Sequence, residues 1–374
     1  MKWINKIVNF FSAKQYLLYL LLFIIAVSLF TYLGSNNTFA DPDAFYHAKM
    51  AEILAQRGAI TEFPWLSATS LKYSFVDHHF LYHLALIPFV QIFSPLIGLK
   101  IASIIFSALT IVFIFWFLKQ LKIKGAFWYA LFLLTINPFI FRLNLGKAQP
   151  LVLIFLFLFI YLMFYRRYLS LLLLSCFYVW LYGGWPIIFV LIILYGGINW
   201  FWPLNKRSWW LFNQGKSKIF WQNILIFISA GLGILAGIFF SPYFPQNLSF
   251  YWQQSFKIAV VNYQNLIGVG GEWYPYPPVD LFLVAIQFFI FFIFAILVFL
   301  YFLKKQPMNS WFLLVLSLIF LLLTLKSRRY VEYFVPVAFC FSALSINTLV
   351  VAKEKVWEKL MPKNLFSLIP VVLL

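Results

Sequence analysis

The sequence predicts an all-α polytopic membrane protein, a transmembrane bundle of about 11 helices with a long first outer loop. Two observations support this fold class. Of the 374 residues, 64% are hydrophobic and 10% are charged, and the mean hydropathy is +0.91. Apolar runs close to the roughly 20 residues that cross a bilayer alternate with short basic clusters. We therefore expect the chain to be embedded in a lipid bilayer.

The net charge of +18 results from 28 lysines and arginines against ten aspartates and glutamates. Such an excess is also found in nucleic-acid-binding proteins. Here the basic residues lie in short clusters between apolar runs, as the positive-inside rule expects. The charge therefore indicates membrane topology, and we expect no nucleic-acid partner. Cys176 and Cys340 both lie in apolar runs, so no disulfide framework is predicted.

We expect about ten spanning helices, and a further apolar run begins near Leu365. Lys2, Lys6 and Lys14 precede the first helix, which assigns the start of the chain to the cytoplasmic side. The chain is thus expected to be one transmembrane domain over 1–374, without a soluble C-terminal domain. The predicted spans are 16–34, 98–118, 125–141, 150–165, 168–182, 186–202, 219–241, 279–303, 309–325 and 331–351.

This order of crossings leaves two long segments on the outer side, 35–97 and 242–278. The second is expected to be a mobile loop, because glycines and prolines gather near its end. Within the first, "FLYHLALIPFVQIF" (80–93) is apolar but only about 14 residues long, so we interpret it as interfacial or re-entrant. If it spanned the membrane, the basic cluster at 119–124 would lie outside.

Most acidic residues fall on the predicted outer side. Asp41, Asp43, Asp77 and Glu272 are there, and His79 follows Asp77 closely. Ionisable groups at membrane depth are costly and usually functional. Carboxylate oxygens are the ligands that magnesium and manganese prefer, so these residues are candidate ligands of a divalent cation, Mg²⁺ or Mn²⁺.

Local structure offers a second explanation for each of these acids. Asp41 could cap a helix that begins near Pro42, and Asp43 would then lie in its first turn, where the helix dipole favours a carboxylate. The apolar residues of 44–54 recur as in an amphipathic helix that lies on a membrane surface. His79 and His83 are spaced as metal ligands can be on one helix face, but interfacial packing explains such a pair equally.

Three of the arginines on the outer side closely follow predicted helices, where the positive-inside rule disfavours them. Arg142 follows the third predicted helix, and Arg328 with Arg329 follows the ninth. The planar guanidinium fork suits a phosphate group. Carboxylates and arginines on one side therefore indicate a metal ion beside a phosphate, although Arg328 and Arg329 could simply flank a helix.

Five segments, in this order along the chain, resemble the catalytic subunit of oligosaccharyltransferases. These are GT-C-fold enzymes that move a glycan from a polyprenyl-phosphate carrier to a protein asparagine. The segments are "ADPDAFYHAKMAEILAQRG" (40–58), "PFIFRLNLG" (138–146), "YVWLYGGWPIIF" (178–189), "GVGGEWYPYPP" (268–278) and "KSRRYVEYFVP" (326–336).

The resemblance implies a role for individual residues. Asp41 matches the metal-binding aspartate, and Glu272 matches the glutamate that approaches the metal and the acceptor amide, so these two are the expected catalytic residues. Arg329 matches the arginine that contacts the carrier phosphate. The other expected substrate-binding residues are Arg328, Arg142 and, in the Trp–Gly–Gly region, Trp185. The expected metal ligands are Asp41, Asp43, Glu272, Asp77 and His79.

The chain departs from the family pattern in two places. After Gly146 the family carries an acidic ligand pair, whereas this sequence reads "GKAQP", with Lys147 and Gln149. Asp43, or Asp77 with His79, is the candidate to replace the missing ligand. The Trp–Trp–Asp acceptor motif of the family is also absent. The chain is therefore expected to be a fragment or a shorter relative.

The function expected from these residues is transfer of a sugar or oligosaccharide from a polyprenyl-(di)phosphate carrier at the outer face of the cytoplasmic membrane. The acceptor would be a protein asparagine, a serine or threonine hydroxyl, or a lipid. Three alternatives stay open. They are another GT-C enzyme, such as a protein O-mannosyltransferase or lipid A aminoarabinose transferase relative, a non-catalytic lipid transporter, and an inactive relative.

Overall fold

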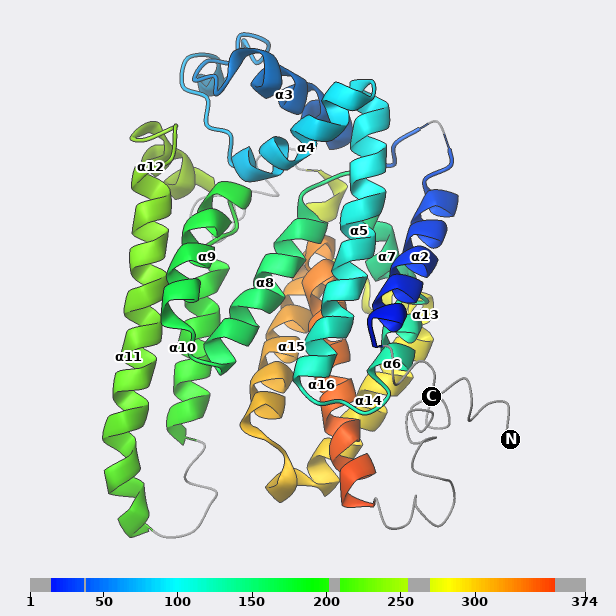
Figure 1. The fold of residues 1–374 in the computed structure, drawn as a ribbon, viewed down its shortest axis with the longest axis vertical. Helices are drawn as coiled ribbons and strands as arrows, with labels where there is room; N and C mark the ends of the chain where they lie inside the picture. Colours follow the sequence, from blue (N-terminus) through cyan, green and yellow to red (C-terminus); the bar gives the residue numbers. More distant parts are fainter. Residues whose placement is uncertain (1–14, 37, 202–208, 255–269, 354–374) are drawn as a thin grey trace. The chain divides into compact units, whose positions relative to one another are not determined.

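The computed structural model describes residues 15–36, 38–201, 209–254 and 270–353, without the side chains of 209–216. All regular elements in these ranges are helices, which confirms the all-α prediction for this part of the chain (Figure 1). The chain divides into two compact units. Unit 1 comprises Met1–Ser35, Ile104–Asn144 and Gly271–Leu374, and unit 2 comprises Asn36–Ser103 and Leu145–Gly270.

Five helices of the described chain are long and apolar enough to cross a membrane, or up to seven if each of two bent pairs is one span. This supports the membrane prediction but gives fewer full-length spans than the sequence suggested. The five helices are α2 (Gln15–Leu33), α5 (Pro95–Gln120), α11 (Trp209–Phe239), α15 (Met308–Lys326) and α16 (Val331–Ala352).

Two predicted spans are broken helices, which corrects the prediction. The run 125–141 forms α6 (Ala126–Leu133) and α7 (Asn137–Leu143), which are bent by 77°. Pro138 accounts for this break, because a proline has no N–H to donate to the carbonyl four residues earlier and its ring clashes with that carbonyl, whereas it is tolerated in the first turn of a helix. The run 279–303 forms α13 (Pro278–Val284) and α14 (Ile286–Tyr301), bent by 97° where Ala285 leaves helical geometry. Apolar composition alone does not reveal such bends.

Four further apolar helices have 13 to 16 residues, and all of them belong to unit 2. They are α4 (Phe80–Ile92), α8 (Gln149–Phe164), α9 (Tyr168–Leu181) and α10 (Ile187–Phe201). At 1.5 Å per residue each is about 20–24 Å long, less than the ~30 Å hydrocarbon core. The run 80–93 forms the short helix α4, and its interfacial or re-entrant position stays a prediction; α8, α9 and α10 are shorter than the full spans predicted for them.

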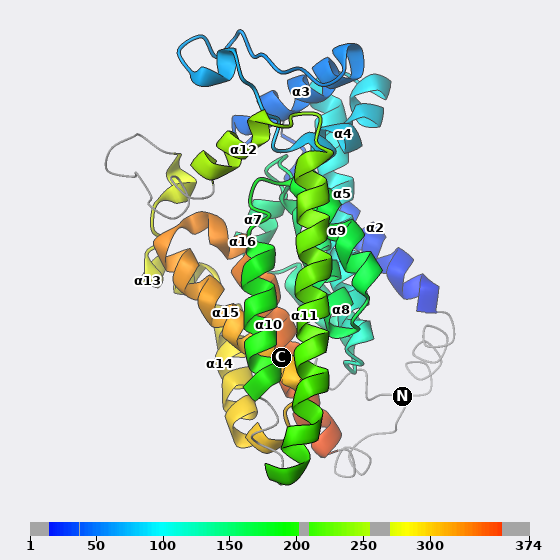
Figure 2. The same ribbon diagram turned by 90° about the vertical axis from the view of Figure 1, so that its left-hand side faces the viewer.

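Unit 1 is built around α16, which is buried over most of its length. Helices α14 and α15 pack against it, as does the short α7 (Figures 1 and 2). Aromatic rings fill these interfaces, and Phe334 of α16 contacts Phe288 and Phe292 of α14. This packing holds the beginning of α16 next to α7, which positions one of the polar clusters described below.

The tightest helix contact in unit 2 joins α9 and α11, which run side by side in Figures 1 and 2. Gly233 and Gly237, one turn apart on α11, face α9. A Cβ at Gly233 would lie 2.1 Å from the carbonyl oxygen of Leu172, and one at Gly237 would lie 2.6 Å from that of Cys176. Small residues in this pattern let membrane helices approach closely.

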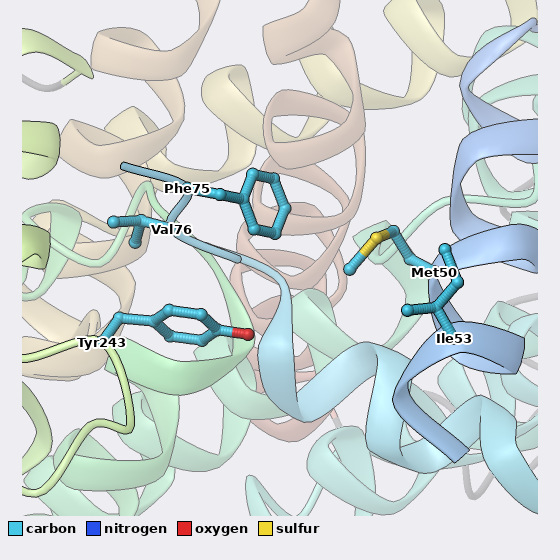
Figure 3. Close-up of a cluster of buried hydrophobic side chains, with 5 residues drawn as sticks. All are labelled: Met50, Ile53, Phe75, Val76 and Tyr243. Atoms are coloured by element: carbon cyan, nitrogen blue, oxygen red, sulfur yellow. The ribbon is translucent and has the colours of Figure 1, made fainter. Parts of the chain in front are cut away.

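The segment between α2 and α4 folds over a small apolar core. Helix α3 (Asp43–Arg57) buries one face, which confirms the amphipathic helix predicted for 44–54. Met50 and Ile53 of α3 form a cluster with Phe75, Val76 and Tyr243 (Figure 3). Residues 255–269 of the predicted mobile loop and the apolar run from Leu365 lie outside the described residues.

Candidate functional site

In unit 2, two of the predicted aspartates share one ammonium group. The Nζ atom of Lys147 lies 2.8 Å from Oδ2 of Asp41 and 2.8 Å from Oδ2 of Asp43. The side chain of Lys147 is only 6% exposed, whereas those of Asp41 and Asp43 are 19% and 59% exposed. These three residues are called the Lys147 cluster below.

The Lys147 cluster depends on the start of α3. Pro42 is the N-cap residue, one position later than the sequence suggested, and Asp41 precedes it. The Oδ1 atom of Asp41 still accepts a hydrogen bond from the backbone N–H of Asp43, at 2.9 Å. One oxygen of Asp41 therefore stabilises the helix start and the other binds Lys147, so capping and charge pairing coexist.

A tight turn brings Lys147 to this position. Gly146 has a φ of +71°, in the left-handed region that glycine tolerates. A Cβ there would lie 3.4 Å from Cβ of Ala44, so the turn lies directly against the first turn of α3. The hydroxyl of Tyr82 on α4 donates to the Gly146 carbonyl at 3.2 Å. These contacts fix the backbone from which Lys147 extends.

A buried chain of polar groups lies in the same unit. His83 Nδ1 is 2.6 Å from Oδ2 of Asp77, and His83 Nε2 is 2.8 Å from Nδ1 of His47. The other oxygen of Asp77 accepts the backbone N–H of His79 at 3.0 Å. A neutral His83 that donates from Nδ1 to Asp77 accepts at Nε2 from the Nδ1–H of His47.

Burial lowers the pKa of His47 well below its usual value, and the neighbouring His83, His78 and Lys147 lower it further. The pKa of His79 is also lowered, mainly by desolvation and then by His78. Both imidazoles are therefore neutral at physiological pH. Neutral rings suit the hydrogen-bonded chain, because a second positive charge beside Lys147 would be unfavourable.

The residues expected to bind a divalent cation do not fit that role as they are arranged. Both oxygens of the buried Asp77 are hydrogen-bonded, and Asp41 and Asp43 bind an ammonium group. Among residues 15–36, 38–201, 209–254 and 270–353, no three His, Cys, Asp or Glu side chains come together as metal ligands do. The metal ion remains a prediction from the family resemblance.

In unit 1, Arg142 at the end of α7 binds two glutamates. Its Nη1 donates to Oε2 of Glu272 at 2.8 Å. Its Nε donates to Oε2 of Glu332 at 2.8 Å, and its Nη2 lies 2.7 Å from the same oxygen. Glu332 is fully buried in the first turn of α16. These three residues are called the Arg142 cluster below.

The segment that carries Glu272 is bound to the segment that carries the two predicted phosphate-binding arginines. Ser327 donates to the carbonyl of Glu272 at 2.9 Å. Arg328 donates from its backbone N–H to the carbonyl of Tyr274 at 2.9 Å and from Nε to that of Pro275 at 3.1 Å. The guanidinium of Arg329 lies 4.2 Å from the ring centroid of Trp273, a cation–π contact.

Trp185, the remaining predicted substrate-binding residue, lies in the turn between α9 and α10. It is partly buried, and its ring contacts Phe189 and Tyr251 edge-on. Its indole Nε1 is buried without a hydrogen-bond partner in the described part of the protein. Burial of an unsatisfied donor is costly, so this atom is a candidate contact for a bound ligand.

The structure thus brings together Asp41 with Asp43 in one unit, and Glu272 with Arg142, Arg328 and Arg329 in the other. Sequence reasoning missed Glu332, although an acid in the first turn of an apolar helix, shortly after Arg328 and Arg329, is an unusual signal. It noted Lys147 only as a departure from the family pattern. The pairing of Lys147 with both aspartates could not be derived from spacing, because a hundred residues separate them in the chain.

No protein-family model and no curated protein matches the sequence. Among solved structures, the archaeal oligosaccharyltransferase AglB from Archaeoglobus fulgidus, in complex with an inhibitory peptide and a dolichol-phosphate, matches with a TM-score of 0.63 at 15% sequence identity. The alignment covers 93% of this chain and 52% of that structure, so the chain spans about half its length. The chain therefore resembles the catalytic subunit of oligosaccharyltransferases in its fold.

Proposed function

We propose that the chain is a glycosyltransferase that moves a sugar or oligosaccharide from a polyprenyl-phosphate or diphosphate carrier to an acceptor at the outer face of the cytoplasmic membrane. The observation that carries this proposal is the fold similarity to AglB, which was solved with dolichol-phosphate and an inhibitory peptide. A protein asparagine is the acceptor that this similarity favours. The order of the five sequence segments supports the same assignment.

Arg328 and Arg329 are the proposed contacts of the carrier phosphate. Arg328 is exposed, and Arg329 is partly exposed while stacked on Trp273. The planar guanidinium fork of arginine suits a bidentate contact with phosphate. As the bond between the sugar and the phosphate breaks, its electron pair goes to the phosphate oxygen, and these positive charges stabilise the departing group.

Glu272 is the proposed contact of the acceptor. Its side chain is 21% exposed, and its carboxylate is held at one oxygen by Arg142. A carboxylate fixed in this way can accept a hydrogen bond from the acceptor nucleophile and take up its proton as the new bond to the sugar forms. Arg142, which sequence reasoning assigned to substrate binding, is instead proposed to position Glu272, because its Nη1 donates to Glu272 while its Nε donates to Glu332.

We also propose that Asp41 takes part in the reaction as a member of the Lys147 cluster. No step is assigned to a divalent cation, because the arrangement of Asp41, Asp43 and Asp77 does not fit one. Trp185, with its buried indole N–H, is the proposed contact of a further substrate group.

The test is binding of a polyprenyl-phosphate sugar to the full chain in lipid nanodiscs, measured by equilibrium dialysis of radiolabelled donor. Arg329→Gln should weaken binding by roughly tenfold or more, since it removes a charge-assisted contact to phosphate. The matched control is Arg57→Gln, at the exposed end of α3, which should bind as the wild type does. Failure of the wild-type protein to bind the donor would overturn the proposed function.

A further inference from the structure

The Lys147 cluster resembles a cation-binding site in which the cation is a side chain of the protein itself, the ammonium group of Lys147. Two carboxylates from the start of α3 converge on one position, and the Nζ atom of Lys147 occupies it at 2.8 Å from each. Lys147 belongs to a run of buried residues, 145–150, whereas the side chain of Asp43 is more than half exposed. The cation is therefore supplied from the interior of unit 2 and not from solvent.

A divalent ion and this ammonium group cannot share the two aspartates. Magnesium and manganese coordinate oxygen at roughly 2.0–2.2 Å, so an ion between the two carboxylates would overlap the position of Nζ. The positive charge of Lys147 would also repel it at that distance. Withdrawal of Lys147 is disfavoured, because Gly146 is held against Ala44 and Tyr82 and the ammonium would lose both of its carboxylate partners.

We infer that Lys147 is the resident cation of this site and that Asp41 and Asp43 bind no divalent metal ion in the wild-type protein. If the chain is the proposed glycosyltransferase, on which this consequence rests, the sugar is transferred without a metal ion at these two aspartates. The inference about the cation itself concerns only the side chains of unit 2. It can therefore fail or hold independently of whether the chain binds a sugar donor.

The experiment measures binding of Mn²⁺ alone, by electron paramagnetic resonance of the free ion, to the full chain in nanodiscs of uncharged lipid. The four proteins are the wild type, Asp41→Asn, Lys147→Gln, and the double variant Lys147→Gln/Asp41→Asn. Lys49→Gln is the matched control, because Lys49 pairs with Glu52 on the exposed side of the same helix α3. It removes one lysine charge without touching the cluster.

Wild type, Asp41→Asn and Lys49→Gln should bind Mn²⁺ equally weakly at millimolar concentration. Lys147→Gln should bind Mn²⁺ at least roughly tenfold more tightly, because it frees two carboxylates, and the double variant should lose this gain. The apparent melting temperature of Lys147→Gln should also rise with added Mn²⁺, unlike that of the wild type.

Two results would overturn the inference. One is binding of Mn²⁺ by the wild type that Asp41→Asn abolishes, which decides the question even if Lys147→Gln fails to fold. The other is a folded Lys147→Gln variant that gains no affinity, since the aspartates would then not form a cation site. Neither result depends on the sugar donor, whose binding is measured separately with Arg329→Gln.

Discussion

The Lys147 cluster and the Arg142 cluster contain the same numbers of basic and acidic side chains but differ in which of these side chains are buried. Each contains one basic residue and two carboxylates, so each carries a formal charge of −1. In the Arg142 cluster one acid, Glu332, has no exposed side-chain surface, whereas in the Lys147 cluster both acids reach the surface. In the first cluster a carboxylate is buried together with the arginine, whereas in the second only the ammonium group is buried.

This difference determines what each basic residue does. Arg142 presents a rigid fork and binds two acids through different nitrogens, so it fixes the orientation of Glu272 relative to the helix that carries Glu332. Lys147 is a compact charge on a flexible stem, and it pairs with both acids without fixing their planes. We therefore regard the Arg142 cluster as a positioning arrangement and the Lys147 cluster as one ammonium group that offsets part of the charge of two carboxylates.

The largest expected effect is loss of Arg142. Arg142→Met leaves Glu332 buried and unpaired, which should destabilise unit 1 by about 3–5 kcal/mol. The measurement is the apparent melting temperature of the purified protein in nanodiscs. The double variant Arg142→Met/Glu332→Gln should recover much of the loss, because it removes the buried charge. A single variant as stable as the wild type would show that Glu332 does not depend on Arg142.

Loss of Lys147 should have a smaller effect. Lys147→Met keeps most of the side-chain volume and leaves two carboxylates that remain partly hydrated, so we expect a destabilisation of about 1–3 kcal/mol. The measurement is again the apparent melting temperature, compared directly with that of Arg142→Met. A lower melting temperature for Lys147→Met than for Arg142→Met would contradict the view that an unpaired buried carboxylate costs more than two partly exposed ones.

Acid should act on the surroundings of the Lys147 cluster. All four histidines of the chain lie in unit 2, and burial lowers the pKa of His47 and of His79. Below pH ~6.5 the unfolded chain binds protons that these folded rings do not, so stability should fall by up to about 1.4 kcal/mol per pH unit for each ring. The effect is absent above this range.

Hydrogen exchange at pH 7.5 and pH 5.5 would test this prediction. Amides of α3 and α4 should lose protection at the lower pH, and those of α15 and α16 should change less. His47→Gln, which removes one of the two rings, should reduce the difference. Equal loss of protection in both units would contradict the assignment to His47 and His79.

The smallest expected effects distinguish the two aspartates. Asp43→Asn removes an ion pair whose acid is 59% exposed, so its cost should be about 0–1 kcal/mol. Asp41→Asn alters a less exposed ion pair and weakens the bond to the Asp43 N–H, so its cost should be larger by roughly 0.5 kcal/mol. Thermal unfolding of the two variants would show which one is less stable. A larger destabilisation by Asp43→Asn would contradict the assignment of Asp41 as the more important partner of Lys147.

The sequence predicted the parts of the fold that depend on composition. The apolar runs and the amphipathic helix after Asp41 were correctly anticipated, because period and length are local properties. The 77° and 97° bends were missed, since a bent pair and a straight span have the same apolar composition. For 125–141 the dipeptide Asn137–Pro138 was the available signal.

The candidate site was predictable as a set of residues but not as a set of contacts. Glu272, Arg328 and Arg329 were chosen for their chemistry and side of the membrane, and the structure joins their segments through backbone hydrogen bonds. The partners Lys147 and Glu332 come from distant parts of the chain, and only packing brings them to Asp41 and Arg142. Charge balance at membrane depth was a hint that each acid needed such a partner.

The hydrogen bonds between 272–275 and 327–328 have a consequence for how two ligands would influence each other. Glu272 cannot leave Arg142 by movement of its backbone without breaking the bonds from Ser327 and Arg328. A molecule that immobilises the arginines therefore also restricts the glutamate. By thermodynamic linkage the effect is mutual, so a ligand at either position changes the affinity at the other by the same factor.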